Sequence, residues 1–127
     1  MNTTKPVILC IDDDADFLDS LQIIIESRGY VFERAGSAED GVRRSRELKP
    51  DLIIVDLMME EVDSGVNFVK DIKAAGDATP IYLLSSVGDN LNISTDYTRL
   101  GLAGVFQKPI NPEVLLATLD RRLKAKP

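Results

Sequence analysis

Three short apolar runs constrain the fold of this chain more than any other feature. They are Val7-Ile8-Leu9-Cys10-Ile11, Leu52-Ile53-Ile54-Val55 and Ile81-Tyr82-Leu83-Leu84. None shows the polar alternation of a strand with one face in water, so each is typical of a strand that is covered on both faces. Two shorter runs, Tyr30-Val31-Phe32-Glu33 and Gly104-Val105-Phe106, are weaker strand candidates. The pattern predicts strands sandwiched between helices.

Helical patterns separate these runs. From Ala15 to Arg28, apolar residues recur at helical spacing, and Gly29 ends the segment like a helix C-cap. Further helices are predicted from Ser37 as cap to Leu48, from Ser64 to Ala75, from Leu91 to Leu100, and from Pro112 onward behind the cap Asn111. Strands that alternate with helices predict a parallel sheet with helices on both faces. We therefore expect an α/β, doubly wound (βα)₅ fold.

The size and charge of the chain narrow its class. Its 127 residues fit one domain, which we expect to span 1–127 with a core from about 6 to 124. The content of 44% hydrophobic and 28% charged residues is that of a soluble globular protein. A net charge of -6 argues against direct nucleic-acid binding, which needs clustered Lys and Arg.

Three observations predict a cytoplasmic protein without a membrane segment. No apolar run approaches the roughly 20 residues of a membrane span. Residues Met1 to Lys5 are polar and do not begin a secretory signal. A single Cys10 cannot form an internal disulfide, and inside an apolar run it is typical of a buried residue in a reducing compartment.

Carboxylates follow two of the predicted strands. Asp12-Asp13-Asp14 follows the first, and Asp56 follows Val55 of the third. Ligands of open parallel sheets bind beyond the carboxyl ends of the strands, so these side chains are expected at one edge. Carboxylates brought together repel unless a cation neutralises them, and oxygen ligands of this kind suit Mg²⁺. The alternative is that the three aspartates only cap the following helix.

A hydroxyl pair and a cation follow the last two strands, as Ser85-Ser86 and Lys108-Pro109. Alone, Ser85 would be an ordinary loop serine and Lys108 a solvated surface charge. Together with the aspartates they form a site for a tetrahedral dianion such as a phosphoryl group. The chain has no histidine, so a phosphohistidine donor would have to come from outside.

On these residues the chain resembles the response-regulator receiver domains of two-component systems, and is similar to the stand-alone chemotaxis regulators and to N-terminal regulatory modules. The resemblance runs from Val7 to about Leu123. It implies a flavodoxin-like fold with strand order 2-1-3-4-5. The matching positions are Asp12 and Asp13 as the acidic pair, Asp56 as phosphoacceptor, Ser85 as the Ser/Thr, Phe106 as the switch aromatic and Lys108 as the lysine.

The resemblance also implies a mechanism. Asp56 would take a phosphoryl group from a histidine kinase or phosphotransfer protein, making the chain a phosphoacceptor switch whose only catalysis is self-catalysed transfer and autodephosphorylation. Mg²⁺ would be bound by Asp13, Asp56 and the backbone carbonyl of Met58, with Asp12 acting mainly through coordinated water. Lys108 would pair with one phosphoryl oxygen and the Ser85 hydroxyl with another.

The implied readout is conformational. Ser85 would move toward the phosphoryl group, and Phe106 would enter the space it leaves; the alternative is that Phe106 is simply a core residue. The output would go to a downstream protein through the face near the fourth and fifth helices. Lys108-Pro109 resembles the family's cis-proline turn.

Two segments depart from the family's pattern. Glu60 stands where a proline is usual, and the Glu60-Glu61 loop is about one residue longer. The stretch from Gly88 to Thr95 is polar and weakly helical, so we expect phosphorylation to order or shift residues 86–101. The apolar residues Met58 and Val87 lie where the family tunes access of water, which predicts a long-lived phosphoryl group.

Two other classes of protein compete with this interpretation. A haloacid-dehalogenase-like phosphatase also uses a strand-end aspartate with Mg²⁺, but it needs a general-acid aspartate where this chain has Met58. A receiver-like module that signals without phosphorylation is disfavoured because every key side chain is present.

Overall fold

The computed structural model describes residues 5–57, 59, 64–86 and 101–123. These residues form a five-stranded, all-parallel sheet in the order β2-β1-β3-β4-β5. The strands are β1 (Val7–Ile11), β2 (Val31–Ala35), β3 (Leu52–Asp56), β4 (Ile81–Ser86) and β5 (Gly104–Lys108). The helices are α1 (Ala15–Ser27), α2 (Ala38–Leu48), α3 (Ser64–Ala74) and α5 (Pro112–Leu123). The flavodoxin-like strand order is thus confirmed, and the helix predicted over 91–100 lies outside the described residues.

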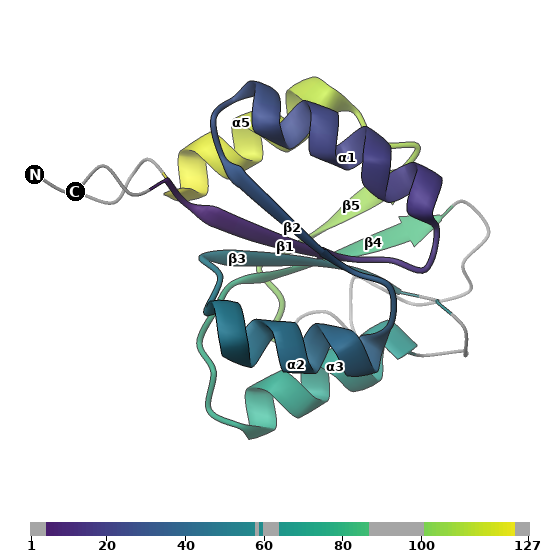
Figure 1. The fold of residues 1–127 in the computed structure, drawn as a ribbon, viewed down its shortest axis with the longest axis vertical. Coiled ribbons are helices and arrows are strands. Elements are labelled where there is room, and N and C mark those ends of the chain that lie inside the picture. The colour runs from purple at the N-terminus through teal and green to yellow at the C-terminus, as the bar shows by residue number, and fades with distance from the viewer. Residues whose placement is uncertain (1–4, 58, 60–63, 87–100, 124–127) are drawn as a thin grey trace, which may run out of the picture.

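Two layers of helices cover the sheet (Figure 1). Helices α1 and α5 lie on one face, and α2 and α3 on the other, here called the α1/α5 face and the α2/α3 face. In β1, Ile8 and Cys10 belong to the core under the α1/α5 face, whereas Leu9 and Ile11 belong to the other core. Because successive side chains of a strand alternate between faces, a strand buried on both sides must be apolar throughout. This is the physical reason for the unbroken apolar runs.

Four strands extend beyond their predicted ends. β3 continues to Asp56 and β4 to Ser86. β2 continues past Glu33 through the half-buried Arg34 to Ala35, and β5 continues to Lys108, which is in register with Ser86 of β4. Strand pairing uses backbone groups, which every non-proline residue carries, so polar residues at an edge strand or a strand end do not interrupt it.

The predicted helix caps are confirmed. The Ser37 side chain accepts a hydrogen bond from the Asp40 backbone N–H at 3.1 Å, and Asn111 Oδ1 accepts from Glu113 and Val114 at 2.9 and 3.1 Å. Gly29, which follows the C-cap residue Arg28 of α1, has a φ of 89°, a left-handed conformation that favours glycine. The caps at Ser37 and Asn111 therefore place the starts of α2 and α5 where the sequence predicts them.

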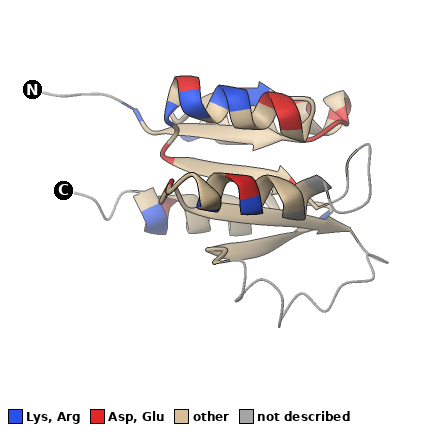
Figure 2. Ribbon diagram, turned by 90° about the horizontal axis from the view of Figure 1, so that it is seen from below, with Lys and Arg blue, Asp and Glu red and all other residues tan. Residues whose placement is uncertain are grey.

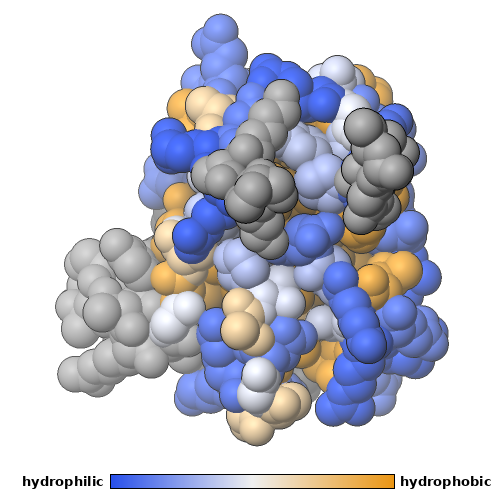
Figure 3. Space-filling view, turned by 90° about the vertical axis from the view of Figure 1, so that its left-hand side faces the viewer, coloured by the Kyte–Doolittle hydropathy of each residue, from blue (hydrophilic) through white to orange (hydrophobic). Residues whose placement is uncertain are grey.

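Charged residues are concentrated on the helices and at strand ends (Figure 2). The side of the molecule at the amino ends of the strands is a mosaic of hydrophilic and hydrophobic residues (Figure 3). Within the part of the chain that the structure describes, no helix has the length and apolar character needed to cross a membrane.

Candidate functional site

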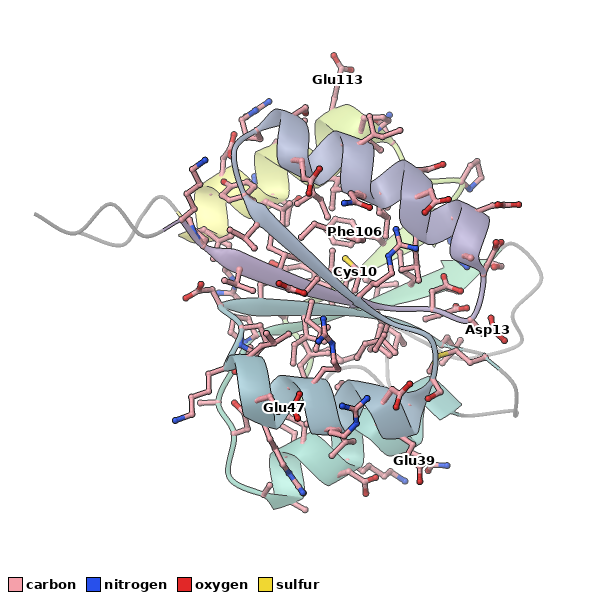
Figure 4. The ribbon with its side chains drawn as sticks, in the orientation of Figure 1. Cys10, Asp13, Glu39, Glu47, Phe106 and Glu113 are labelled. Carbon is pink, nitrogen blue, oxygen red and sulfur yellow. The ribbon has the colours of Figure 1, made fainter. Side chains whose placement is uncertain are left out.

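An acidic cluster lies at the carboxyl edge of the sheet. β1 and β3 are neighbours, with Ile11 in register with Val55, so Asp12, directly after β1, and Asp56, the last residue of β3, lie at the same level. One carboxylate oxygen each from Asp12, Asp13 and Asp56 lies within 4.8 Å of the others. Figure 4 shows Asp13 at this edge, where β1 leads into α1. The expected meeting of these three aspartates is what the structure shows.

Burial differs among the three carboxylates. Asp12 and Asp56 are 1% and 6% exposed, whereas Asp13 is exposed. Asp12 Oδ1 accepts a hydrogen bond from the Asp14 backbone N–H at 2.9 Å. The carboxylate oxygens of the buried Asp12 and Asp56 and of the exposed Asp13 could together hold a hard divalent cation. The exposed side of such a site would leave room for a further ligand from solvent.

The three consecutive aspartates have different roles. Asp14 is the N-cap of α1, because its Oδ1 accepts hydrogen bonds from the backbone N–H groups of Asp16 and Phe17 at 3.1 and 3.2 Å. Asp12 and Asp13 belong to the acidic cluster. The capping alternative therefore holds for Asp14 only.

Lys108 brings a positive charge into the cluster from the end of β5. Its Nζ lies 2.9 Å from Asp12 Oδ2 and 3.4 Å from Asp56 Oδ2. Burial by itself lowers the pKa of the ammonium, but pairing with Asp12 and Asp56 outweighs burial and raises the pKa above its ordinary value. Lys108 is therefore a charged member of the site, and not a solvated surface residue. The Lys108-Pro109 peptide is cis, as the resemblance implied.

Cys10 lies beneath the site on β1 and takes no part in its chemistry. Burial, with a smaller contribution from Asp12, raises the pKa of the Cys10 thiol far above its ordinary value. Because only the thiolate is a strong nucleophile or metal ligand, a buried protonated thiol is inert. The single cysteine is a core residue, as its apolar run predicts.

Ser85 is buried near the end of β4, 2% exposed. It comes directly after Leu84, the register partner of Asp56. In β4, Tyr82 and Leu84 face the α1/α5 core and Leu83 faces the other core, so alternation places Ser85 on the α2/α3 face. Ser85 thus approaches the carboxyl edge from the face opposite to Leu84.

Phe106 lies on the α1/α5 face. It is 5% exposed, belongs to the same core as Tyr82 and Leu84, and stacks on Tyr82 with ring centroids 5.0 Å apart. Figure 4 shows it between the sheet and the helices α1 and α5. Because Ser85 and Phe106 occupy opposite faces, the expected movement of Phe106 into space left by Ser85 has no direct route. A switch role for Phe106 stays a prediction.

Sequence reasoning missed Gly65, the second residue of α3. A Cβ built on Gly65 would lie 2.2 Å from the backbone oxygen of Asp56 and 2.8 Å from Leu57 Cα. The Gly65 N–H donates to the Leu57 carbonyl at 3.0 Å. Only glycine permits this close approach of α3 to the residue that ends β3. A glycine at a helix start soon after a strand-end aspartate was the available signal.

Sequence reasoning also missed Phe17, which it treated as part of the apolar stripe of α1. The ring centroid of Phe17 lies 4.3 Å from Lys108 Nζ. Phe17, in the first turn of α1, and Lys108, at the end of β5, are 91 positions apart, and no local sequence pattern joins them.

Several predictions cannot be compared with the structure because their residues lie outside the described part of the chain. These residues are Met58, the Glu60-Glu61 loop and 87–100, which include Val87 and most of the segment 86–101.

Comparisons with known proteins agree with this fold and site. The family model of the response regulator receiver domain matches residues 8–120. The chain is 28% identical to the DNA-binding response regulator MtrA of Mycobacterium tuberculosis over 124 residues, 98% of this chain and 53% of that protein. It is 32% identical to the transcriptional regulatory protein YdfI of Bacillus subtilis over 120 residues, 92% of this chain and 54% of that protein.

Among solved structures, the chemotaxis protein CheY4 of Vibrio cholerae superposes with a TM-score of 0.84 at 28% identity. The superposition covers 94% of this chain and all of that one. The N-terminal domain of an uncharacterised protein from Wolinella succinogenes gives a TM-score of 0.85 at 29% identity, over 95% of this chain and 96% of that one.

The fold is that of a doubly wound α/β domain, and the chain belongs to the response regulator receiver domain family of two-component systems. As a class, receiver domains are phosphoacceptor switches that work with histidine kinases, and they are not classical enzymes. The family match removes the phosphatase alternative. The chain spans about half the length of the curated relatives it matches.

Proposed function

We propose that this receiver domain accepts a phosphoryl group on Asp56 from a histidine kinase or phosphotransfer protein, with Mg²⁺ as cofactor. One observation carries the proposal: the carboxylates of Asp12, Asp13 and Asp56 meet within 4.8 Å at the sheet edge, and Lys108 Nζ lies within 3.4 Å of two of them. Since Mg²⁺ prefers oxygen ligands, this donor set fits the ion.

The transfer forms one bond and breaks one. A carboxylate oxygen of Asp56 attacks the phosphorus in line, the P–N bond of the donor phosphohistidine breaks, and its electron pair returns to the imidazole. The new bond is an acyl phosphate. When bound, Mg²⁺ would offset the repulsion between the carboxylates and the incoming phosphoryl oxygens.

The residues of this chain supply positioning and charge. Asp13 and Asp56, with the Met58 carbonyl, would hold the metal, and Asp12 would act mainly through coordinated water. Lys108 stays charged and pairs with a phosphoryl oxygen, while the Ser85 hydroxyl takes another from the α2/α3 face. The phosphorylated form then signals to a downstream protein through the face near residues 91–100 and α5.

The direct test exposes the protein to acetyl phosphate with Mg²⁺ and follows its intact mass. We expect the mass of one phosphoryl group to be added to the wild type, and beryllofluoride with Mg²⁺ to shift the NMR signals of the site. Asp56→Asn should gain no mass, and the matched control Asp40→Asn, at an exposed position on α2, should be modified like the wild type. Equal modification of the Asp56 variant would contradict the proposal.

A further inference from the structure

The ammonium of Lys108 has a third neighbour besides two carboxylates. It lies 2.9 Å from Asp12 Oδ2, 3.4 Å from Asp56 Oδ2 and 4.3 Å from the ring centroid of Phe17. The face of an aromatic ring is electronegative and attracts an ammonium placed over it. Resting on the proposed function, we propose that Phe17 is a positioning residue whose ring holds Lys108 where the phosphoryl oxygens arrive.

Asp14, the last of the three consecutive aspartates, fixes the position of Phe17. Its backbone N–H donates to Asp14 Oδ1 at 3.2 Å, and the next residue, Leu18, donates its N–H to the Asp14 carbonyl at 3.1 Å. Leu18 is 3% exposed, and the half-buried Phe17 packs against the α1/α5 core. The ring is therefore fixed at one end by a helix cap and at the other by core packing.

The ring differs from the two carboxylates because it takes no part in the chemistry. Asp56 changes its charge when it is phosphorylated, and Asp12 is shared with the metal site. The neutral Phe17 ring does not bind Mg²⁺ and does not accept the phosphoryl group. Of these three contacts of Lys108, the one with Phe17 keeps its character throughout the transfer.

The ring and the Lys108 side chain line the same open groove. Phe17, Ser20, Ile24, Lys108, Pro109 and Ile110 line a groove of about 580 Å³ between α1 and the segment after β5. The Lys108 side chain is 20% exposed, and its stem has four flexible bonds. Without the ring, water and other rotamers would become available to the ammonium from this side.

The test compares Phe17→Leu, which keeps an apolar side chain but removes the ring, with Phe17→Tyr, which keeps the ring. The rate constant of Asp56 phosphorylation by acetyl phosphate should fall about three- to tenfold in Phe17→Leu and stay within about twofold in Phe17→Tyr. The NMR signals of the Lys108 Hε protons should move downfield in Phe17→Leu, because the ring-current shift is lost.

Phe32→Leu is the matched control. Phe32 is 8% exposed in the same core, and its ring contacts a different cation, with the Arg34 guanidinium 5.5 Å from the ring centroid. This variant should lose core packing, measured by urea unfolding, but keep the transfer rate. Equal slowing in Phe32→Leu and Phe17→Leu would overturn the proposal, because it would reduce the effect to packing.

Two other results would overturn it: a wild-type rate with unmoved Lys108 signals in Phe17→Leu, or a Phe17→Tyr variant as slow as Phe17→Leu. Failure of the proposed function is distinguishable from these. In that case the wild type itself would not be phosphorylated on Asp56, whereas failure of the Phe17 proposal leaves the wild type fully competent.

Discussion

Two clusters of charged and polar side chains lie at opposite ends of the sheet, and their charge balance differs. At the carboxyl edge, three carboxylates meet one ammonium, a formal charge of minus two for Asp12, Asp13, Asp56 and Lys108. Near the start of β2, the single carboxylate of Asp120 on α5 pairs with the Arg28 guanidinium and accepts a hydrogen bond of 2.5 Å from the Tyr30 hydroxyl.

The difference separates a binding site from a structural tie. The Asp120 carboxylate is balanced by the Arg28 guanidinium, and the cluster joins α5 to the connection between α1 and β2, so it needs no further cation. The acidic edge keeps excess negative charge in a buried place, which is unfavourable unless a cation is supplied. The imbalance of buried charge supports the metal-binding role proposed above for the carboxyl edge.

The largest expected effect comes from removing the only cation of the four-residue acidic cluster. Lys108→Met should slow phosphorylation of Asp56 about a hundredfold, the scale for loss of one charge-stabilising group at a reacting centre. The rate with acetyl phosphate measures this. Lys70→Met, an exposed residue of α3, is the control and should behave like the wild type. A rate loss below twofold in Lys108→Met would contradict a role for the ammonium.

Breaking the balanced cluster should affect stability and leave the chemistry unchanged. Asp120→Ala leaves the buried Tyr30 hydroxyl and Arg28 without this acceptor, so the free energy of unfolding in urea should fall by about 1–3 kcal/mol. As a control, Asp19→Ala removes a solvent-exposed ion pair with Arg34 and should change the free energy of unfolding by less than about 1 kcal/mol. Slower phosphorylation of Asp56 in Asp120→Ala would contradict the prediction that the Asp120 cluster affects stability alone.

Adding Mg²⁺ should stabilise the acidic cluster at the carboxyl edge and should not affect the Asp120 cluster. Mg²⁺ should raise the melting temperature of the wild type, because a ligand that binds the folded state stabilises it. Asp13→Asn should bind Mg²⁺ about tenfold more weakly and show a smaller rise. Asp16→Asn, at an exposed position in the first turn of α1, is the control. Equal Mg²⁺ stabilisation of Asp13→Asn and the wild type would remove Asp13 from the metal site.

The smallest effect appears only at alkaline pH. Burial, followed by the hydrogen bond to Asp120, raises the pKa of Tyr30 above its ordinary value of 10.0. The folded state therefore keeps this proton after the unfolded state has lost it, so stability is present below pH 10 and decreases as the pH rises above it. Urea unfolding from pH 9 upward should show a shallower decrease in Tyr30→Phe than in the wild type. Parallel slopes would exclude this contribution.

Most of the fold was predictable because it depends on local patterns. Unbroken apolar runs identify strands covered on both faces, and caps such as Ser37 and Asn111 place the helix starts. Asp12 and Asp56 were predictable as neighbours because the carboxyl ends of parallel strands share one edge. The division of labour within the triplet, with Asp14 as a cap, depends on where α1 begins in space.

The sequence by itself determined the helices and strands of the described residues, the acidic edge and the charged partner Lys108, since each follows from local periodicity and strand polarity. Only the tertiary structure decided which face each side chain occupies. Phe106 and Ser85 lie on opposite faces, Phe17 reaches Lys108, and Gly65 approaches Asp56. These relations depend on strand register and on how the helix layers pack, which are set by contacts between residues far apart in the chain.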